Sequence, residues 1–120
     1  MSGLCIFEAG KSTMLAVSAF TLSWTHSVEK TEWRERWIIK DHGMVIAEAR
    51  VRGSGAGMDP GPGARLEDGW WIWHPTSPPV SSLALANSGA TQSHWTLCAG
   101  DRCLEIGTEA EEPTLLKACP

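Results

Sequence analysis

Turn-forming residues interrupt this 120-residue chain about every 8 to 15 residues, and this spacing constrains the fold more than any other feature. The clearest turns are Ala9-Gly10-Lys11, Asp41-His42-Gly43, Asn87-Ser88-Gly89, Gly100-Asp101 and the glycine-rich stretch 53–63. Short runs rich in Val, Ile, Leu, Thr and Trp lie between them. Because regular turns between short apolar runs are typical of antiparallel β-structure, we expect one all-β domain over residues 1–120. Its architecture should be an antiparallel sandwich or open barrel with short hairpins.

The expected strands cover residues 3–8, 12–16, 19–28, 33–40, 44–51, 70–74, 82–86, 92–98 and 103–106, with a further strand at 114–118. A helix over residues 29–40 is the competing interpretation, because Trp33 and Trp37 are four positions apart. No other residues of that segment complete a helical stripe, so we favour the strand.

The period of two in residues 19–51 predicts which side chains share a face of the sheet. The shared face is expected to comprise Phe20, Leu22, Trp24, His26 and Val28, with Trp33, Glu35, Trp37 and Ile39. A loop at residues 29–32 would place Leu22 opposite Ile39, Trp24 opposite Trp37 and His26 opposite Glu35.

The next turn fixes a third strand against the second. A three-residue turn at 41–43, with Gly43 in the left-handed conformation, places Trp37 opposite Ala47 and Glu35 opposite Ala49. It also places Arg36 opposite Glu48, a favourable cross-strand charge pair.

Charge and hydropathy limit the partners. Ten Lys and Arg against fourteen Asp and Glu give a net charge of −4. A nucleic-acid surface needs a basic excess, so we expect no nucleic-acid partner. Since no apolar stretch is long enough for a spanning helix, we also expect no direct membrane insertion. Glu8 and Lys11 interrupt the apolar N-terminal region, which departs from an export signal and favours a cytoplasmic protein.

The four cysteines are Cys5, Cys98, Cys103 and Cys119. Their spacing lacks the paired ligands of a zinc site, so we expect neither a metal nor another cofactor. Cys98 and Cys103 should face each other across a hairpin loop at 99–102, where a disulfide is geometrically possible. A reducing cytoplasm disfavours that bond, so we expect four small buried hydrophobic side chains.

His26 and Glu35 are the strongest candidates for a functional pair, because the expected register places both on one mostly apolar face. The carboxylate would stabilise the imidazolium, whereas burial would oppose it. Such a pair could bind a ligand, move a proton or sense pH, and the competing interpretation is a structural pair in the core. Ser27 points to the opposite face from His26, so we expect no serine nucleophile activated by that histidine.

Residues 53–63 alternate glycine with other residues. Glycine loops that bind nucleotides lead into a helix, and Pro60 and Pro62 forbid one here. The segment is either a flexible linker between two sheets or backbone that closely approaches a ligand, with Met58 as an adaptable contact.

Trp70, Trp71 and Trp73 lie in one expected strand, with Trp71 and Trp73 on one face and Trp70 and Ile72 on the other. Both faces are therefore apolar. Either both are covered as part of the core, or one exposes tryptophan that could grip a partner.

The run 20–33, most specifically His26-Ser27-Val28-Glu29, and the run 53–58 resemble an uncharacterised bacterial family of domains of unknown function. Members of that family are encoded beside, or fused to, TAXI-type TRAP transporters. The resemblance extends from about Cys5 to about Cys103. It implies an accessory role in the uptake of small organic anions and no catalytic residue. Some relatives carry an export segment, so a periplasmic location is the alternative that the resemblance implies.

The leading expectation is a non-enzymatic accessory or ligand-sensing domain associated with a TRAP-type transporter. A small organic anion and a membrane transporter subunit are the expected partners. The ligand would lie where two loops emerge at one end of the sheet, bound by His26, Ser27, Glu29, Glu35, Ser54, Gly55 and Met58. The alternatives are a small enzyme that uses His26 and Glu35 as an acid–base pair, and a Trp-rich protein-interaction module.

Overall fold

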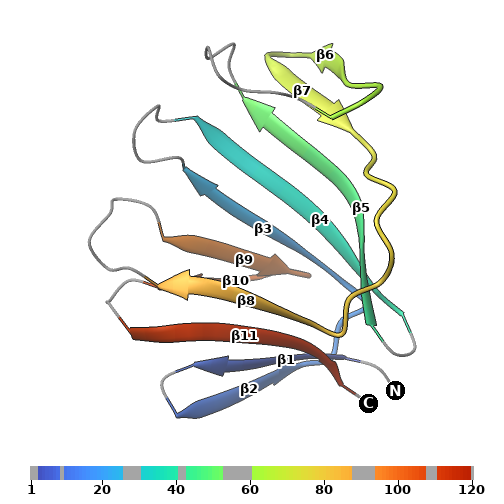
Figure 1. Cartoon of the computed structure of the whole chain (residues 1–120). Helices are drawn as coiled ribbons and strands as arrows, with labels where there is room; N and C mark the ends of the chain where they lie inside the picture. Colours follow the sequence, from blue (N-terminus) through green and yellow to red (C-terminus); the bar gives the residue numbers. More distant parts are fainter. Residues whose placement is uncertain are drawn as a thin grey trace.

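Eleven β-strands form two antiparallel sheets in the computed structural model, which describes residues 3–8, 10–25, 31–40, 43–52, 61–87, 94–107 and 111–119 (Figure 1). The smaller sheet has the order β2-β1-β11-β8 and consists of β1 (Gly3–Glu8), β2 (Lys11–Leu15), β8 (Ser82–Asn87) and β11 (Glu111–Cys119). The larger sheet has the order β10-β9-β3-β4-β5-β7-β6. It consists of β3 (Ala19–Thr25), β4 (Glu32–Lys40), β5 (Gly43–Arg52), β6 (Arg65–Glu67), β7 (Trp70–Trp73), β9 (Trp95–Ala99) and β10 (Arg102–Ile106).

The prediction of an all-β antiparallel sandwich is confirmed, and the two sheets do not close into a barrel. Within the described residues each expected strand is present with small shifts at its ends, whereas residues 26–28 and 92–93 of two expected strands lie outside them. The helix over 29–40 is wrong, because residues 32–40 form β4. Strand β6 was not expected, because its three residues are all exposed and show no apolar alternation. Within the described residues, no helix has the length and apolar character needed to cross a membrane.

The core lies between the two sheets and takes side chains from both. Strands β1, β2, β8 and β11 contribute leucine and isoleucine, whereas the larger sheet adds an aromatic pair, Phe20 and Trp37, stacked at 6.4 Å. The buried apolar residues of this cluster are Leu4, Ile6, Leu15, Phe20, Leu22, Trp37, Ile39, Met44, Ile46, Ala49, Leu85, Leu97, Ala99, Ile106 and Leu116.

The pairing of β3 with β4 differs from the predicted register by four residues. Leu22 lies opposite Glu35, and Trp24 lies opposite Trp33. The predicted pairing of His26 with Glu35 is therefore wrong. The difference is already present at the last described pair of these strands, where Thr25 lies opposite Glu32. Since a shift by an even number of residues preserves the faces, Leu22 still lies in the core, as expected.

The pairing of β4 with β5 follows the predicted register over its first half. Glu35 lies opposite Ala49, and Arg36 lies opposite Glu48. The register then shifts by one residue at Ala47, so Trp37 lies opposite Ile46 instead of Ala47. This β-bulge turns the larger side chains of β5 into the core, where Ile46 is 9% exposed.

Gly43 does not occupy the left-handed turn position that was predicted for it. It belongs to β5, opposite Lys40, and its φ is not in the left-handed region. A Cβ at this position would lie 2.8 Å from the carbonyl oxygen of Val80. The absent side chain lets the segment before β8 approach, and the Met44 amide donates to the Val80 carbonyl at 2.7 Å.

All four cysteines form disulfides, so their prediction as buried hydrophobic side chains is wrong. Cys98 and Cys103 face each other across the β9–β10 hairpin, as expected, with Cα atoms 4.1 Å apart. The turn is tighter than predicted, because Ala99 pairs with Arg102 and Gly100 takes a φ of 62°. The second bond, Cys5–Cys119, joins the start of β1 to the end of β11, which lie side by side in Figure 1.

Candidate functional site

Of the seven residues predicted to bind a ligand, only Glu35 lies within the described part of the chain. His26, Ser27, Glu29, Ser54, Gly55 and Met58 all lie outside it. The strands that lead into those segments end on the same side of the larger sheet. Thr25 closes β3 opposite Glu32, and Arg52 closes β5 one residue beyond the Trp33–Val51 pair.

Glu35 lies on the inner face of β4, half-buried between the two sheets. Its Oε1 atom accepts a hydrogen bond of 3.1 Å from the Trp37 indole N–H. Burial raises the pKa of the Glu35 carboxyl from its usual value of 4.5, and the hydrogen bond from Trp37 partly opposes that rise. Its neighbours across the sheet, Leu22 and Ala49, provide no proton partner. The acid–base pair proposed for an enzyme therefore loses its geometric basis.

Four half-buried tryptophans continue this inner face toward the ends of β3 and β5. Trp24 stacks on Trp33 with centroids 6.1 Å apart and lies 4.8 Å from the ring of Trp95. Trp33 in turn meets Trp73 edge-on at 6.3 Å. This tryptophan row packs across β9, β3, β4 and β7, so most of the unusual tryptophan content forms the edge of the core.

The question left open for residues 70–73 is answered by the pairing of β7 with β5. Trp71 and Trp73 lie opposite Val51 and Ala49, so they face inward, whereas Trp70 lies opposite Arg52 and faces outward. The side chains divide between the two faces as predicted. All three tryptophans are half-buried, so they do not form one exposed tryptophan patch.

Trp70 is surrounded by guanidinium groups on the outer face of the larger sheet. The Cζ atoms of Arg34, Arg50 and Arg52 lie 4.9, 5.8 and 5.3 Å from the centre of its ring. Arginine stacks well on tryptophan, because its planar, weakly hydrated guanidinium is attracted by the ring's electrons. Packing against the Trp70 ring thus brings together three guanidiniums from β4 and β5.

A surface hollow of about 260 Å³ lies beside Trp70, and we call it the arginine hollow. Its lining consists of Thr21, Arg34, Glu35, Arg36, Glu48 and Arg50. These residues come from β3, β4 and β5, and all except Glu35 occupy outward positions of those strands. None of these arginines is among the ligand-binding residues predicted from the sequence, although the alternation on β4 and β5 places them together.

Carboxylates on the same strands hold some of these arginines in position. Arg50 donates two hydrogen bonds to Glu48, the shorter 2.8 Å long, and Arg34 donates one of 3.0 Å to Glu32. Arg36 forms no ion pair with a carboxylate of the described residues. With Arg52, which lies against Trp70, the ring and the hollow beside it present four guanidiniums against the three carboxylates of Glu32, Glu35 and Glu48.

This chemistry suits the binding of an anion. Arginine binds carboxylate or phosphate groups through two parallel N–H donors, and an excess of cations leaves some of those donors available. The part of the chain that the structure describes contains no group of three His, Cys, Asp or Glu side chains that could hold a metal ion.

The fold and the surface together define a small β-sandwich with a cationic outer face on an acidic chain. Residues 20–106 match the family described as a domain of unknown function (DUF1850), so the chain belongs to that family. The match covers β8 and all of the larger sheet except Ala19, whereas β1, β2 and β11 lie outside it. No curated protein and no solved structure matches the chain.

Proposed function

We propose that this chain is a non-enzymatic binding domain that holds a small organic anion in the arginine hollow. The observation that carries the proposal is the concentration of four guanidiniums, three around Trp70 and that of Arg36 in the hollow beside it, on a chain whose net charge is −4. Cations gathered against the overall charge raise the local concentration of an anion.

The lining favours binding over catalysis. Its dominant groups are guanidinium donors, which remain charged at any physiological pH and neither supply nor remove protons. Stacking on Trp70 and the bonds to Glu32 and Glu48 restrict Arg34 and Arg50 before a ligand arrives. Restricting donors in advance lowers the entropy that binding must overcome. A carboxylate of the anion would meet Arg36, which forms no ion pair with a carboxylate of the described residues.

The proposed biological setting is that of an accessory protein to a TRAP-type transporter, where the domain would bind the anion that the transporter takes up. The resemblance of residues 20–33 and 53–58 to domains encoded beside such transporters supports this setting. The arginine hollow supports the same substrate class, because the resemblance implies small organic anions.

We also propose an oxidising compartment, in place of the cytoplasmic location expected from the N-terminal sequence. The two disulfides support this, because such bonds persist outside the cytoplasm and are rare within it. Protein taken from its native host and treated with a thiol-alkylating reagent before any reduction should carry no label. Four labelled cysteines would instead indicate a reducing compartment.

The test of anion binding is calorimetric titration with citrate, succinate and butyrate at low salt. We expect affinity to increase with the number of carboxylates and to fall as salt is added, because the contacts are charge-assisted. Arg36→Gln should weaken citrate binding by at least about tenfold, which corresponds to the loss of one charge-assisted hydrogen bond.

Arg65→Gln is the matched control, because Arg65 is exposed on the same sheet but pairs with Glu67 on β6 and does not line the hollow. It should leave citrate affinity unchanged. Equal losses in both variants would mean that citrate responds only to overall charge. Absence of any binding by these carboxylates, or turnover of one of them, would overturn the proposal.

A further inference from the structure

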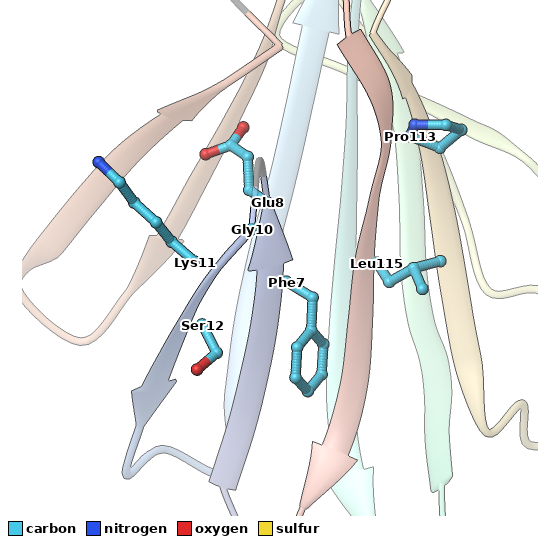
Figure 2. A pocket seen from close by; sticks show the side chains of 7 residues that line it. All are labelled: Phe7, Glu8, Gly10, Lys11, Ser12, Pro113 and Leu115. Atoms are coloured by element: carbon cyan, nitrogen blue, oxygen red, sulfur yellow. The ribbon is translucent and has the colours of Figure 1, made fainter.

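The outer face of the smaller sheet carries a second hollow, whose lining side chains differ in type from those of the arginine hollow. Its volume is about 420 Å³, within the range of small-molecule sites. One half is lined by Phe7, Pro113 and Leu115, and the other by Gly10, Lys11 and Ser12, beside the β1–β2 turn. We call it the hairpin hollow. Figure 2 shows Phe7, Ser12 and Leu115 side by side on three neighbouring strands.

The apolar half of the hollow carries large side chains that are exposed to solvent. Phe7 is 40% exposed and Leu115 is 36% exposed. Met14, on β2 of the same face but outside the hollow, is 53% exposed. Of the large apolar side chains exposed in the described residues, only Leu66 lies elsewhere. Apolar groups gathered on one face mark a place where something apolar binds.

Two lysines bring positive charge to the hollow and its surroundings. Lys11 lines the polar end of the hollow from the position directly opposite Glu8, and Figure 2 shows both side chains at this end. The Lys117 ammonium lies 5.7 Å from the centre of the Phe7 ring. Where the structure describes the outward side chains of these four strands, none is a carboxylate.

Glu8 is the one acid of the hollow, and its carboxylate is already engaged. Its Oε2 atom accepts hydrogen bonds from the Gly107 amide at 3.4 Å and from the Thr114 hydroxyl at 3.2 Å. These bonds tie β1 to β11 and to the end of β10. The charge of Lys11 therefore remains available to a ligand, since no described carboxylate forms an ion pair with it.

We infer that the hairpin hollow binds an amphipathic anion, with its apolar chain on Phe7, Pro113 and Leu115 and its anionic group at Lys11. A medium-chain carboxylate has this form. The arginine hollow has polar walls and suits a hydrophilic anion of several charges, so the two sites select different ligands. A second copy of the chain is a poorer occupant, because two such faces would bring their lysines together.

The test is an NMR titration of the whole chain with octanoate, octylamine and butyrate. Octanoate should shift the amide signals of β1, β2 and β11, with a dissociation constant of roughly 0.1 to 10 mM for a ligand of this size. Octylammonium has the same chain with the opposite charge and should bind at least about fivefold more weakly. Butyrate should bind more weakly than octanoate, because its chain covers less of the apolar half.

Two variants and a matched control locate the contacts. Lys11→Met should remove the preference for octanoate over octylammonium, and Leu115→Ser should weaken both amphiphiles. Met14→Ser removes a more exposed apolar group of the same face without touching the hollow, so it should leave octanoate binding unchanged. Citrate affinity should be unaffected by all three changes, which separates this site from the arginine hollow.

Equal binding of octanoate and octylammonium would overturn the inference, as would a loss in Met14→Ser equal to that in Leu115→Ser. Sedimentation velocity at increasing protein concentration tests whether a second copy of the chain binds this face instead. If the chain dimerises and Leu115→Ser abolishes the dimer, the face is an interface between copies and the amphiphile site is wrong.

Discussion

At the scale of single residues, Glu35 is the side chain whose environment most changes its chemistry. It sits on the inner face of β4 between Trp33 and Trp37, where burial raises its pKa. A carboxyl that binds its proton more tightly in the folded chain than in the unfolded chain favours folding at low pH. That contribution is lost as pH rises from below the usual pKa through the raised pKa. Glu35 therefore makes the fold less stable at neutral pH than an uncharged side chain would.

Glu35→Gln should raise the melting temperature at pH 7 by a few degrees, because glutamine is uncharged and still accepts the hydrogen bond from Trp37. The gain should disappear near pH 4, where the native carboxyl is itself protonated. Thermal denaturation between pH 4 and pH 8 measures the difference. As a control, Glu48→Gln should give no such gain, because Glu48 is paired with Arg50. A gain from Glu35→Gln that is independent of pH would contradict the assigned cause.

Sequence patterns predicted the faces of residues 20–39 but not their partners. Alternation assigns a side chain to one face of a strand, and the faces of Leu22, Glu35 and Trp37 follow it. The partner depends on where the connection begins, and no pattern in residues 25–32 marked the end of β3 at Thr25. A register shift of four residues leaves every side chain on the same face, so the alternation could not distinguish the predicted pairing of His26 with Glu35 from the observed one.

At the scale of elements, one glycine and one β-bulge let other segments of the chain contact the β4–β5 hairpin. Gly43 lets the Val80 segment bond to Met44, and the bulge at Ala47 turns Ile46 inward. The carbonyl of Ala47 accepts a hydrogen bond of 3.0 Å from His74 Nδ1, so the segment after β7 reaches the bulge. Both features hold segments outside the hairpin against β5.

Gly43→Ala should lower the free energy of unfolding by about 1 to 3 kcal/mol, the usual range for forcing an atom into a packed position. The added Cβ would lie 2.8 Å from the Val80 carbonyl oxygen, so the segment around Val80 must retreat. Hydrogen exchange should accelerate at the Met44 and Val80 amides, which bond to each other's carbonyls. Amides of the β9–β10 hairpin serve as the internal control, and equal acceleration there would indicate global destabilisation instead.

Strand alternation and register could have predicted part of the arginine hollow, but not the contact of its arginines with Trp70. Arg34 and Arg36 alternate on β4, and the correctly predicted register places Arg50 directly beside Arg34. The sequence predicts only a favourable charge pair between Arg36 and Glu48 on this face. The attraction of the arginines to Trp70 depends on β7 lying beside β5, a pairing between distant segments that no local pattern encodes.

At the scale of the whole molecule, the two disulfides differ greatly in what they restrain. Cys5–Cys119 spans 114 residues and closes nearly the whole chain into a ring, whereas Cys98–Cys103 spans five. A crosslink stabilises mainly by reducing the freedom of the unfolded chain, and this effect grows with the length of the closed loop. The long crosslink also compensates for a small core shared between two sheets.

Replacing Cys5 and Cys119 with alanine should lower the free energy of unfolding by about 4 to 5 kcal/mol, against about 2 kcal/mol for Cys98 and Cys103. Urea denaturation of the two double variants, beside the native chain with and without reductant, gives the comparison. Reductant should reproduce the sum of the two losses. A larger loss from the short hairpin crosslink would show that local packing, and not chain freedom, determines the stabilisation.

The position of the Cys5–Cys119 bond also determines how the molecule would respond to mechanical load. The first residue of β1 pairs with the last of β11, so tension applied at Gly3 and Cys119 would separate these strands one pair at a time. The covalent bond stops that separation at Cys5 and carries the force directly across it. The residues between the two cysteines bear no tension, so both hollows would keep their geometry while the domain is held under strain by its ends.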